Sequence, residues 1–292
     1  MRKSLRTAAL TAALSAVALC TASSAMAGTP TGKYAKFQYC PYTNPATDAC
    51  IYASITSGSF KLGNANVPIT ASTPITIQGG LGAPNDVGDN VFLPAVGAPS
   101  LSPTPLKVPG GLIGLVDTGG FSGLLISLFN AAVASVNDVY ATAEVAGPVT
   151  FNASNFIGEA GVALKLPLRV HLTNPFLGSS CYIGSTSTPV SLNLTSGATS
   201  PPPPNTSIHG ASGTPTFEDG GQYIKFAGGS LVDNSFAAPA ASNCGYLLLD
   251  KIIITAAVNL KEGLPAAAGK NTAIQTGDQY LGGPAAIIAS IP

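Results

Sequence analysis

Carboxylate side chains are the residues of this chain with the clearest capacity for chemistry. A pair of Asp or Glu residues on either side of a glycosidic bond can act as general acid and as base or nucleophile. Glu144 and Glu159 lie on neighbouring β-prone segments and are candidates for such a pair. Sugar sites commonly also offer a flat aromatic platform, for which Trp is best suited. The chain contains no Trp, which counts against a glycosidase.

Two further carboxylates, Asp117 and Asp233, each follow a valine. The segment 116–119, Val-Asp-Thr-Gly, resembles the active-site loop of aspartic proteases, in which two loops bring two carboxylates together around one proton. Gly120 stands where that family places Ser or Ala, and Asp233 is followed by Asn-Ser. The alternative is a turn that places Asp117 near a helix N-terminus, where the helix dipole favours it. The sequence thus contains catalytic candidates but no complete catalytic motif.

Serine nucleophiles and metal ions lack their usual residue spacings in this chain. There is no Gly-x-Ser-x-Gly motif, and we expect His171 on the polar face of a strand and His209 in a loop. Asp86 and Asp89 lie in the segment Asn-Asp-Val-Gly-Asp-Asn, which offers the oxygen ligands that calcium prefers. The segment has no EF-hand spacing and no closing Glu. We therefore expect a polar turn there, and no cofactor.

The first 27 residues have the form of an export signal. Basic residues are followed by an apolar run over 8–19 and by the small-x-small triplet Ala25-Met26-Ala27. The sequence predicts cleavage after Ala27, so that the secreted chain begins at Gly28. The apolar run is too short for a standard membrane span.

Four cysteines follow this leader, and an even number in an exported chain indicates two disulfides. Three connectivities are open. The simplest pairs Cys40 with Cys50 and Cys181 with Cys244, because each bond then closes within its own half of the chain. Zinc is the rival interpretation, but no Cys-x-x-Cys spacing occurs and both histidines lie far from a cysteine pair.

The elements that must position these residues are mostly short β-prone runs between Gly, Pro, Asn and Ser. In the run over 162–172, Val and Leu alternate with polar residues, which is the period of a strand. Pro167 within it indicates an edge strand or a bulge. The other strands are expected at 34–39, 51–56, 67–77, 139–145, 189–194, 223–226 and 246–260.

Many short strands with frequent turns predict a mostly β fold, a sandwich or a jelly-roll-like architecture. We expect one secreted β-rich domain over 28–292, with a subdivision near the Pro- and Gly-rich stretch 82–110 as an open alternative.

One amphipathic helix is expected over about 121–136, where apolar residues recur at helical spacing. The helix lacks Lys and Arg, which a membrane-surface helix carries on its polar face. We therefore expect it to pack on the sheet, and we do not expect membrane contact.

Composition excludes some functions and favours others. Thirteen basic and thirteen acidic residues balance, whereas a nucleic-acid binder needs a basic surface. Only 9% of the residues are charged, against about 25% in a typical soluble domain. Weak charge repulsion permits association with neutral partners or with a second copy of the chain. Such a surface is typical of a protein of the cell exterior.

Two blocks of sequence carry a family resemblance. The first runs from Lys36 to Gly80 around Cys40 and Cys50, and the second combines 174–184, 231–236 and 259–265. Together they resemble a group of uncharacterised secreted β-rich proteins of actinobacteria, over most of the mature chain. The resemblance implies export and a disulfide framework, and it carries no activity.

The sequence as a whole predicts a secreted, non-enzymatic protein of the cell surface or the extracellular space, acting by binding or assembly. Its partners would be further copies of itself or cell-wall components. An extracellular hydrolase with carboxylate chemistry is the first alternative. A membrane-active protein that uses the helix over 121–136 is the second.

Overall fold

A computed structural model describes residues 28–112 and 136–292 of the chain. The leader over 1–27, Asp117 and all but the last residue of the expected helix over 121–136 lie outside the described residues. Strands dominate the described part, and they form one antiparallel sheet of 14 strands. The predicted mostly β fold is therefore confirmed.

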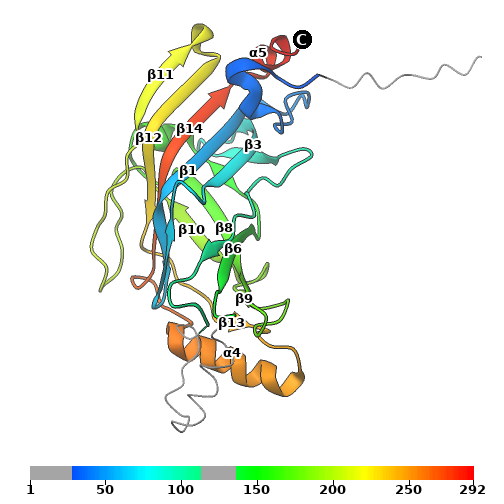
Figure 1. Cartoon of the computed structure of the whole chain (residues 1–292). Coiled ribbons are helices and arrows are strands. Elements are labelled where there is room, and N and C mark those ends of the chain that lie inside the picture. The colour runs from blue at the N-terminus through cyan, green and yellow to red at the C-terminus, as the bar shows by residue number, and fades with distance from the viewer. Residues whose placement is uncertain (1–27, 113–135) are drawn as a thin grey trace, which may run out of the picture.

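The described elements succeed one another along the chain as follows: η1 (Gly32–Phe37), β1 (Ala49–Leu62), β2 (Ala65–Ile69), β3 (Ile75–Pro84), β4 (Asn90–Pro94), β5 (Leu106–Lys107), β6 (Tyr140–Val145), β7 (Thr150–Phe151), α3 (Ala153–Ile157), β8 (Leu164–Thr173), β9 (Tyr182–Ile183), β10 (Val190–Leu194), β11 (Thr214–Glu218), η2 (Asp219–Gly221), β12 (Tyr223–Asp233), β13 (Ala241–Ser242), α4 (Leu248–Glu262), β14 (Thr272–Gly282) and α5 (Pro284–Ala289). The described part is elongated, with α4 across one end and η1 and α5 at the other (Figure 1).

The sheet is continuous from the N-terminal to the C-terminal part of the described chain. Its path runs β11-β12-β14-β1-β3-β4-β7-β8-β6-β5, so β14, close to the C-terminus, lies between β1 and β12. The Pro- and Gly-rich stretch 82–110 contributes β4 and β5 to this same sheet.

Two backbone hydrogen bonds join β12, near one end of this path, to the segment after β10, which lies beside β8. Thr195, directly after β10, donates its N–H to the carbonyl of Val232 on β12 at 2.9 Å and accepts from the N–H of Val232 at 2.8 Å. Strand β10 pairs in turn with β8. The sheet therefore folds over on itself, and its inner faces enclose the core like the two layers of a sandwich.

Alternating apolar residues fill this core. Strands β10 and β14 bury every second side chain along most of their length. This alternation is expected of a sheet with one face on the core and the other exposed to solvent. Phe156 of α3 packs between the layers, with its ring centroid 5.7 Å from that of Phe151 on β7 and 5.1 Å from that of Phe226 on β12. These aromatic contacts connect strands that lie far apart in the sheet order.

A second apolar cluster lies at the end opposite α4. Phe37 of η1 and Ile287 of α5 are buried against Tyr223 of β12 and the Cys40–Cys50 disulfide. The segment 34–39, predicted as a strand, is thus mainly the 3-10 helix η1. Its apolar and aromatic residues are buried by packing on the sheet rather than by joining it.

The second wrong strand prediction concerns 246–260, most of which belongs to the helix α4. The run Ile252–Thr255 is β-branched and fits a strand by propensity. Lys251, Thr255 and Asn259 recur every fourth residue, and Gly263 follows with a left-handed φ of 62°. Both are helix signals, because residues four apart share a helix face and Gly favours the position after a helix. The predicted strand at 67–77 is likewise two strands, β2 and β3, separated by a turn.

Pro167 lies in an internal strand and not at an edge. It is in β8, which pairs with β10 on one side and with β6 and β7 on the other. Its carbonyl accepts from the N–H of Ala146 in the loop between β6 and β7. The nitrogen of Pro167 therefore faces the break between two partner strands, where no ladder hydrogen bond is required of it.

Asp233 strengthens the closure of the sheet, and its removal should destabilise the fold. The side chain is 1% exposed; it accepts from the N–H of Asn193 at 2.7 Å and from the N–H and Oγ of Ser235 at 2.8 and 2.7 Å. We expect Asp233→Ala to lower the free energy of unfolding by about 3 kcal/mol, because buried donors lose a charged acceptor. Chemical denaturation measures this.

The matched control for this experiment is Asp86→Ala, because Asp86 is exposed. That change should stay within about 0.5 kcal/mol of the wild type. Equal losses for the two variants would contradict the role given to Asp233.

Candidate functional site

The structure places Glu144 in a cluster of polar side chains on the outer face of β6, β8 and β9. Arg169 donates to Oε2 of Glu144 from Nε at 2.8 Å, and its Nη2 lies 2.7 Å from the same oxygen. His171 Nδ1 lies 4.0 Å from Oε1 of Glu144, and the His171 ring stacks on Tyr182 at 4.5 Å. Glu144 is thus engaged by Arg169 as a cross-strand pair, without a second carboxylate in this cluster.

The other described carboxylates of the catalytic hypotheses have separate partners. Glu159 accepts from the N–H and the Oγ of Ser212 at 2.8 and 2.9 Å, and these hydrogen bonds hold its pKa below the usual value. Asp233 accepts hydrogen bonds from Asn193 and Ser235, where β12 meets β10. Within residues 28–112 and 136–292, no hydrogen bond or ion pair joins two of Glu144, Glu159 and Asp233. Each of these three carboxylates is therefore engaged by partners of its own, and none of them pairs with another.

Asp86 and Asp89, the calcium candidates, lie in the turn before β4. The Nζ of Lys165 is 2.6 Å from Oδ2 of Asp89, and Asn152 donates to Oδ1 at 3.1 Å. These hydrogen bonds, that of Lys165 above all, hold the pKa of Asp89 below its usual value. Asp86 is exposed. In the part of the chain that the structure describes, no group of three or more His, Cys, Asp and Glu side chains could hold a metal ion.

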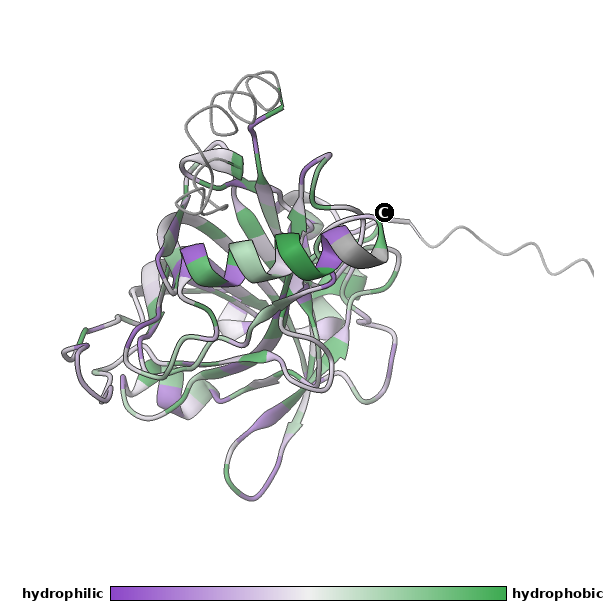
Figure 2. Cartoon of the chain, turned by 90° about the horizontal axis from the view of Figure 1, so that it is seen from below, coloured by the Kyte–Doolittle hydropathy of each residue, from purple (hydrophilic) through white to green (hydrophobic). Residues whose placement is uncertain are grey.

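The most unusual surface is instead formed by α4. The helix lies across one end of the described structure, which Figure 2 shows from below. The Cys181–Cys244 disulfide connects the segment just before α4 with the segment just before β9. Both predicted disulfides are thus confirmed. This second bond closes a sequence separation of 63 residues and anchors the start of α4 to the sheet.

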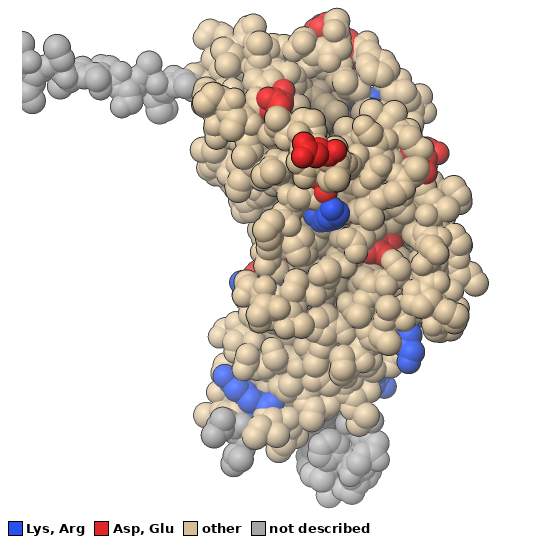
Figure 3. Space-filling model, turned by 180° about the vertical axis from the view of Figure 1, so that it is seen from behind, with Lys and Arg blue, Asp and Glu red and all other residues tan. Residues whose placement is uncertain are grey.

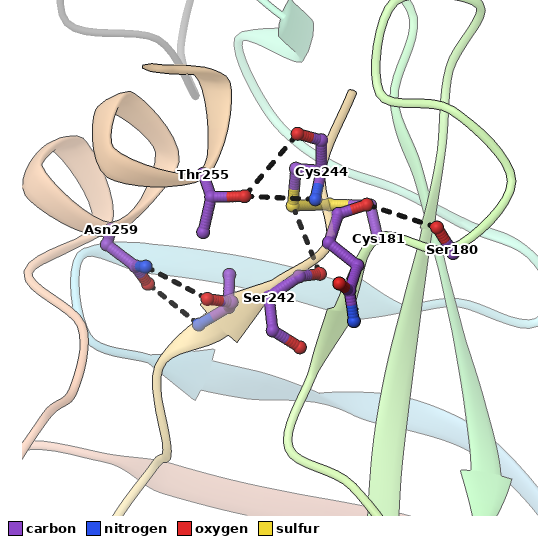
Figure 4. The surroundings of a disulfide bond; sticks show 8 residues. Ser180, Cys181, Ser242, Cys244, Thr255 and Asn259 are labelled. Atoms are coloured by element: carbon purple, nitrogen blue, oxygen red, sulfur yellow. Dashed lines mark hydrogen bonds between the residues drawn. A yellow bond between two sulfur atoms is a disulfide. The ribbon is translucent and has the colours of Figure 1, made fainter. Parts of the chain in front are cut away.

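Polar side chains attach α4 to the rest of the protein (Figure 4). Asn259 accepts from the N–H of Ala241 at 2.7 Å and donates to the carbonyl of the same residue at 2.9 Å. Thr255 Oγ1 accepts from the N–H of Cys244 at 3.0 Å and donates to its carbonyl at 3.4 Å. Strand β13 pairs with β9 along one edge. On its other edge, the side chain of Asn259 makes the two hydrogen bonds with Ala241 that a neighbouring strand would otherwise make.

The C-terminal end of α4 is held by the tight turn between β1 and β2. Gly63 begins this turn with a φ of 60°, a conformation that favours glycine. Asn64 donates its N–H to the carbonyl of Glu262 at 2.9 Å and its Nδ2 to the carbonyl of Lys261 at 2.7 Å. Carbonyls that the helix itself leaves unpaired are thereby satisfied.

The side of α4 with Thr255, Val258 and Asn259 faces the protein, and a second apolar side of the helix faces outward. Ile252 and Ile253 are each 63% exposed and Leu260 is 71% exposed. Residues 252, 253, 256 and 260 form one stripe at helical spacing. Tyr246 and Leu247, just before the helix, are 64% and 74% exposed. We call these six residues the α4 face: Tyr246, Leu247, Ile252, Ile253, Ala256 and Leu260.

This arrangement leaves more apolar surface outside than burial alone would produce. A helix on a globular domain normally turns its apolar stripe to the core and its polar residues to water. Here the inner side combines Val258, which is fully buried in the core, with the polar residues Thr255 and Asn259. On the outer side, Ile252, Ile253 and Leu260 project away from the protein. Contiguous apolar surface of this kind is typical of an interaction site. The predictions over 246–260 missed it because they assigned a strand.

No helix within the described ranges has the length and apolarity needed to cross a membrane. Comparison with family models, with curated proteins and with solved structures finds no match. The α4 face is therefore argued from its own chemistry.

The attachment of α4 through Asn259 can be tested directly. Asn259→Ala removes the acceptor and the donor that pair with Ala241. We expect a loss of about 2 kcal/mol in the free energy of unfolding and faster amide hydrogen exchange in α4. Asn66, exposed on β2 and without a side-chain hydrogen bond among the described contacts, supplies the control Asn66→Ala. Unchanged exchange in α4 of the Asn259 variant would contradict this attachment.

Glu262, the last residue of α4, makes stability depend on pH. The residue is 5% exposed, its Oε2 has no hydrogen-bond partner, and burial raises the pKa of the carboxyl. A raised folded-state pKa favours folding when the carboxyl is protonated, and this contribution is lost as the pH rises through that pKa. We expect Glu262→Gln to increase the free energy of unfolding at neutral pH.

The expected advantage of the Gln variant shrinks as the pH falls toward the ordinary carboxyl value of 4.5, because the wild-type side chain then becomes neutral as well. Urea denaturation at several pH values measures the difference between the two proteins. A difference that is constant with pH would contradict the stated cause.

Proposed function

We propose that this protein is exported, begins at Gly28 after cleavage of the leader, and acts by binding outside the cytoplasm, with the α4 face as its contact surface. The observation that carries the proposal is the outward apolar stripe of α4. Two disulfides indicate an oxidising, extracellular environment. The proposal keeps the prediction from the sequence that the protein binds a partner and is not an enzyme. It assigns this binding to the α4 face.

Other large apolar side chains that are exposed in the described structure are scattered. Val87 and Val96 lie in the loops before and after β4, and Phe217 lies on β11. Single exposed apolar residues are ordinary. The α4 face differs because four of its members, at 252, 253, 256 and 260, adjoin one another along a helix. Burial of a large aliphatic side chain contributes roughly 1.5–3 kcal/mol. Since these side chains contribute little to the core, most of that free energy remains for a partner.

The rest of the surface favours association as well. With only 9% charged residues in the whole chain, electrostatic repulsion between two such molecules, or between one molecule and a neutral wall component, is weak. A rigid attachment also favours binding, because a surface held in one conformation loses little entropy when a partner contacts it. The hydrogen bonds of Thr255 and Asn259 provide this rigidity.

The proposal predicts that changes on the α4 face alter where the protein is found. We expect the triple variant Ile252→Ser, Ile253→Ser and Leu260→Ser to fold and to be exported, but to pass from the cell-associated fraction into the medium. Immunodetection of both fractions on a non-reducing gel measures this, and the gel also shows the disulfides.

The control is the triple variant Val87→Ser, Val91→Ser and Val96→Ser, which changes three exposed apolar residues of another region. It should partition like the wild type. An identical distribution of the wild type and both variants would overturn the proposal, as would catalytic turnover that saturates with substrate and survives loss of the α4 face.

A further inference from the structure

We propose that the α4 face binds the surface of an anionic lipid bilayer, with α4 lying flat in the membrane–water interface. This inference rests on the proposed function, because it names the partner of the same surface. It goes beyond the sequence-based expectation, which considered membrane contact only for the segment 121–136 and did not expect it.

The side chains of the α4 face match the chemistry of an interfacial helix. Such a helix places aliphatic and aromatic residues in the boundary between headgroups and acyl chains and keeps cationic residues at the headgroups. Ile252, Ile253 and Leu260 supply the aliphatic part. Tyr246 supplies an amphipathic ring, a residue type that suits this boundary. Phe176, 40% exposed, lies beside Leu177, whose carbonyl accepts from the N–H of Gly245.

Basic residues surround the face. Lys251 and Lys261 belong to α4 itself. Lys61 on β1 lies opposite Asn66, and Asn66 and Lys261 line the same open hollow. None of these three lysines forms an ion pair in the described structure. Lys61 and Lys261 are exposed and can approach lipid phosphates, whereas Lys251 is half-buried on the side of α4 that carries Thr255 and Asn259.

The acidic groups at this end are few, and most are engaged. Asp138 is bound to Lys107 at 2.7 Å, Glu262 is buried, and Asp250 accepts from the N–H of Tyr246. On the face that Figure 3 shows, acidic side chains lie toward the end opposite α4, and basic ones lie nearest to α4. This asymmetry directs the α4 end toward a negatively charged surface.

The length and attachment of α4 determine how it would meet the bilayer. Its 15 residues extend about 22 Å, less than the roughly 30 Å hydrocarbon core. Its polar side is bonded to β13, to Cys244 and to the turn at Asn64, so the helix cannot leave the sheet without breaking these bonds. The helix would therefore lie parallel to the membrane, with its outward stripe at the level of the headgroups and upper acyl chains.

A second copy of the chain is a weaker candidate for the partner. Stable protein–protein interfaces bury about 800 Å² on each side and involve about 20–30 residues. The α4 face is one narrow stripe on a single helix. A lipid surface needs no such area, because binding strength follows the apolar area inserted plus the attraction of basic residues to anionic lipids.

An introduced tryptophan provides the direct test. The chain has no Trp, so in Ile253→Trp the new indole is the only one. We expect its emission to shift to the blue with vesicles of phosphatidylcholine mixed with phosphatidylglycerol, and to be quenched when the lipids carry bromine on their acyl chains. Val96→Trp is the matched control, because Val96 is 64% exposed on another region. Its emission should not change.

Vesicle flotation of the whole secreted protein measures its partition coefficient between water and lipid, and so the contribution of each side chain to binding. Ile253→Ser and Leu260→Ser should each lower the partition coefficient about tenfold, because each removes an inserted aliphatic side chain. The double variant Lys61→Glu and Lys261→Glu should lose the preference for anionic over zwitterionic vesicles and the dependence on salt. Val96→Ser should bind like the wild type.

Three outcomes would overturn the lipid inference: no flotation of the wild type with either vesicle, no effect of the serine changes, or an unshifted indole at position 253. A dimer that light scattering detects without lipid and that Ile253→Ser abolishes would assign the face to a second copy instead. If flotation fails but the triple serine variant still leaves the cell-associated fraction, the lipid inference is wrong and the proposed binding function stands. If flotation fails and the triple serine variant also stays in the cell-associated fraction, both the lipid inference and the proposed binding function are wrong.

Discussion

The pair of hydrogen bonds between Asn259 and the backbone of Ala241 decides the orientation of α4. A buried backbone N–H or carbonyl without a partner is costly, and the outer edge of β13 offers one of each. The Asn259 amide satisfies both, with Thr255 acting in the same way at Cys244. Because these polar residues share one side of the helix with the buried Val258, that side faces the protein, and Ile252 and Ile253 face outward. The candidate function depends on this arrangement.

The closed sheet makes such an arrangement stable. Strand β14 lies between β1 and β12, and the bridge between Thr195 and Val232 joins β12 to the segment after β10, beside β8. The inner faces of the sheet supply most of the buried residues of the core, and α4 adds Val258 to them. The helix is also fixed by the Cys181–Cys244 bond and by hydrogen bonds. Its outer apolar side does not serve the core and can contact a partner instead.

Much of the fold could be predicted because its signals are local. The alternation over 162–172 corresponds to β8, and two disulfides within separate halves were the simplest pairing of four cysteines. The predictions failed at 34–39 and 246–260, where β-prone composition was read without its spacing. For α4 the spacing was present, in polar residues every fourth position. The candidate carboxylates could not be placed from sequence, since their distances depend on strand order, which no local pattern encodes.

The sequence by itself determined the mostly β character, the two disulfides and the sparse charge, because residue type and local period decide them. Only the tertiary structure decided that Glu144, Glu159 and Asp233 have separate partners and that the apolar stripe of α4 faces outward. A helix with apolar residues on two sides is compatible with either orientation. The side that faces the protein is the one whose Val258 fills the core and whose polar residues meet the backbone groups at β13 and Cys244. These partners lie next to α4 only once the sheet has formed.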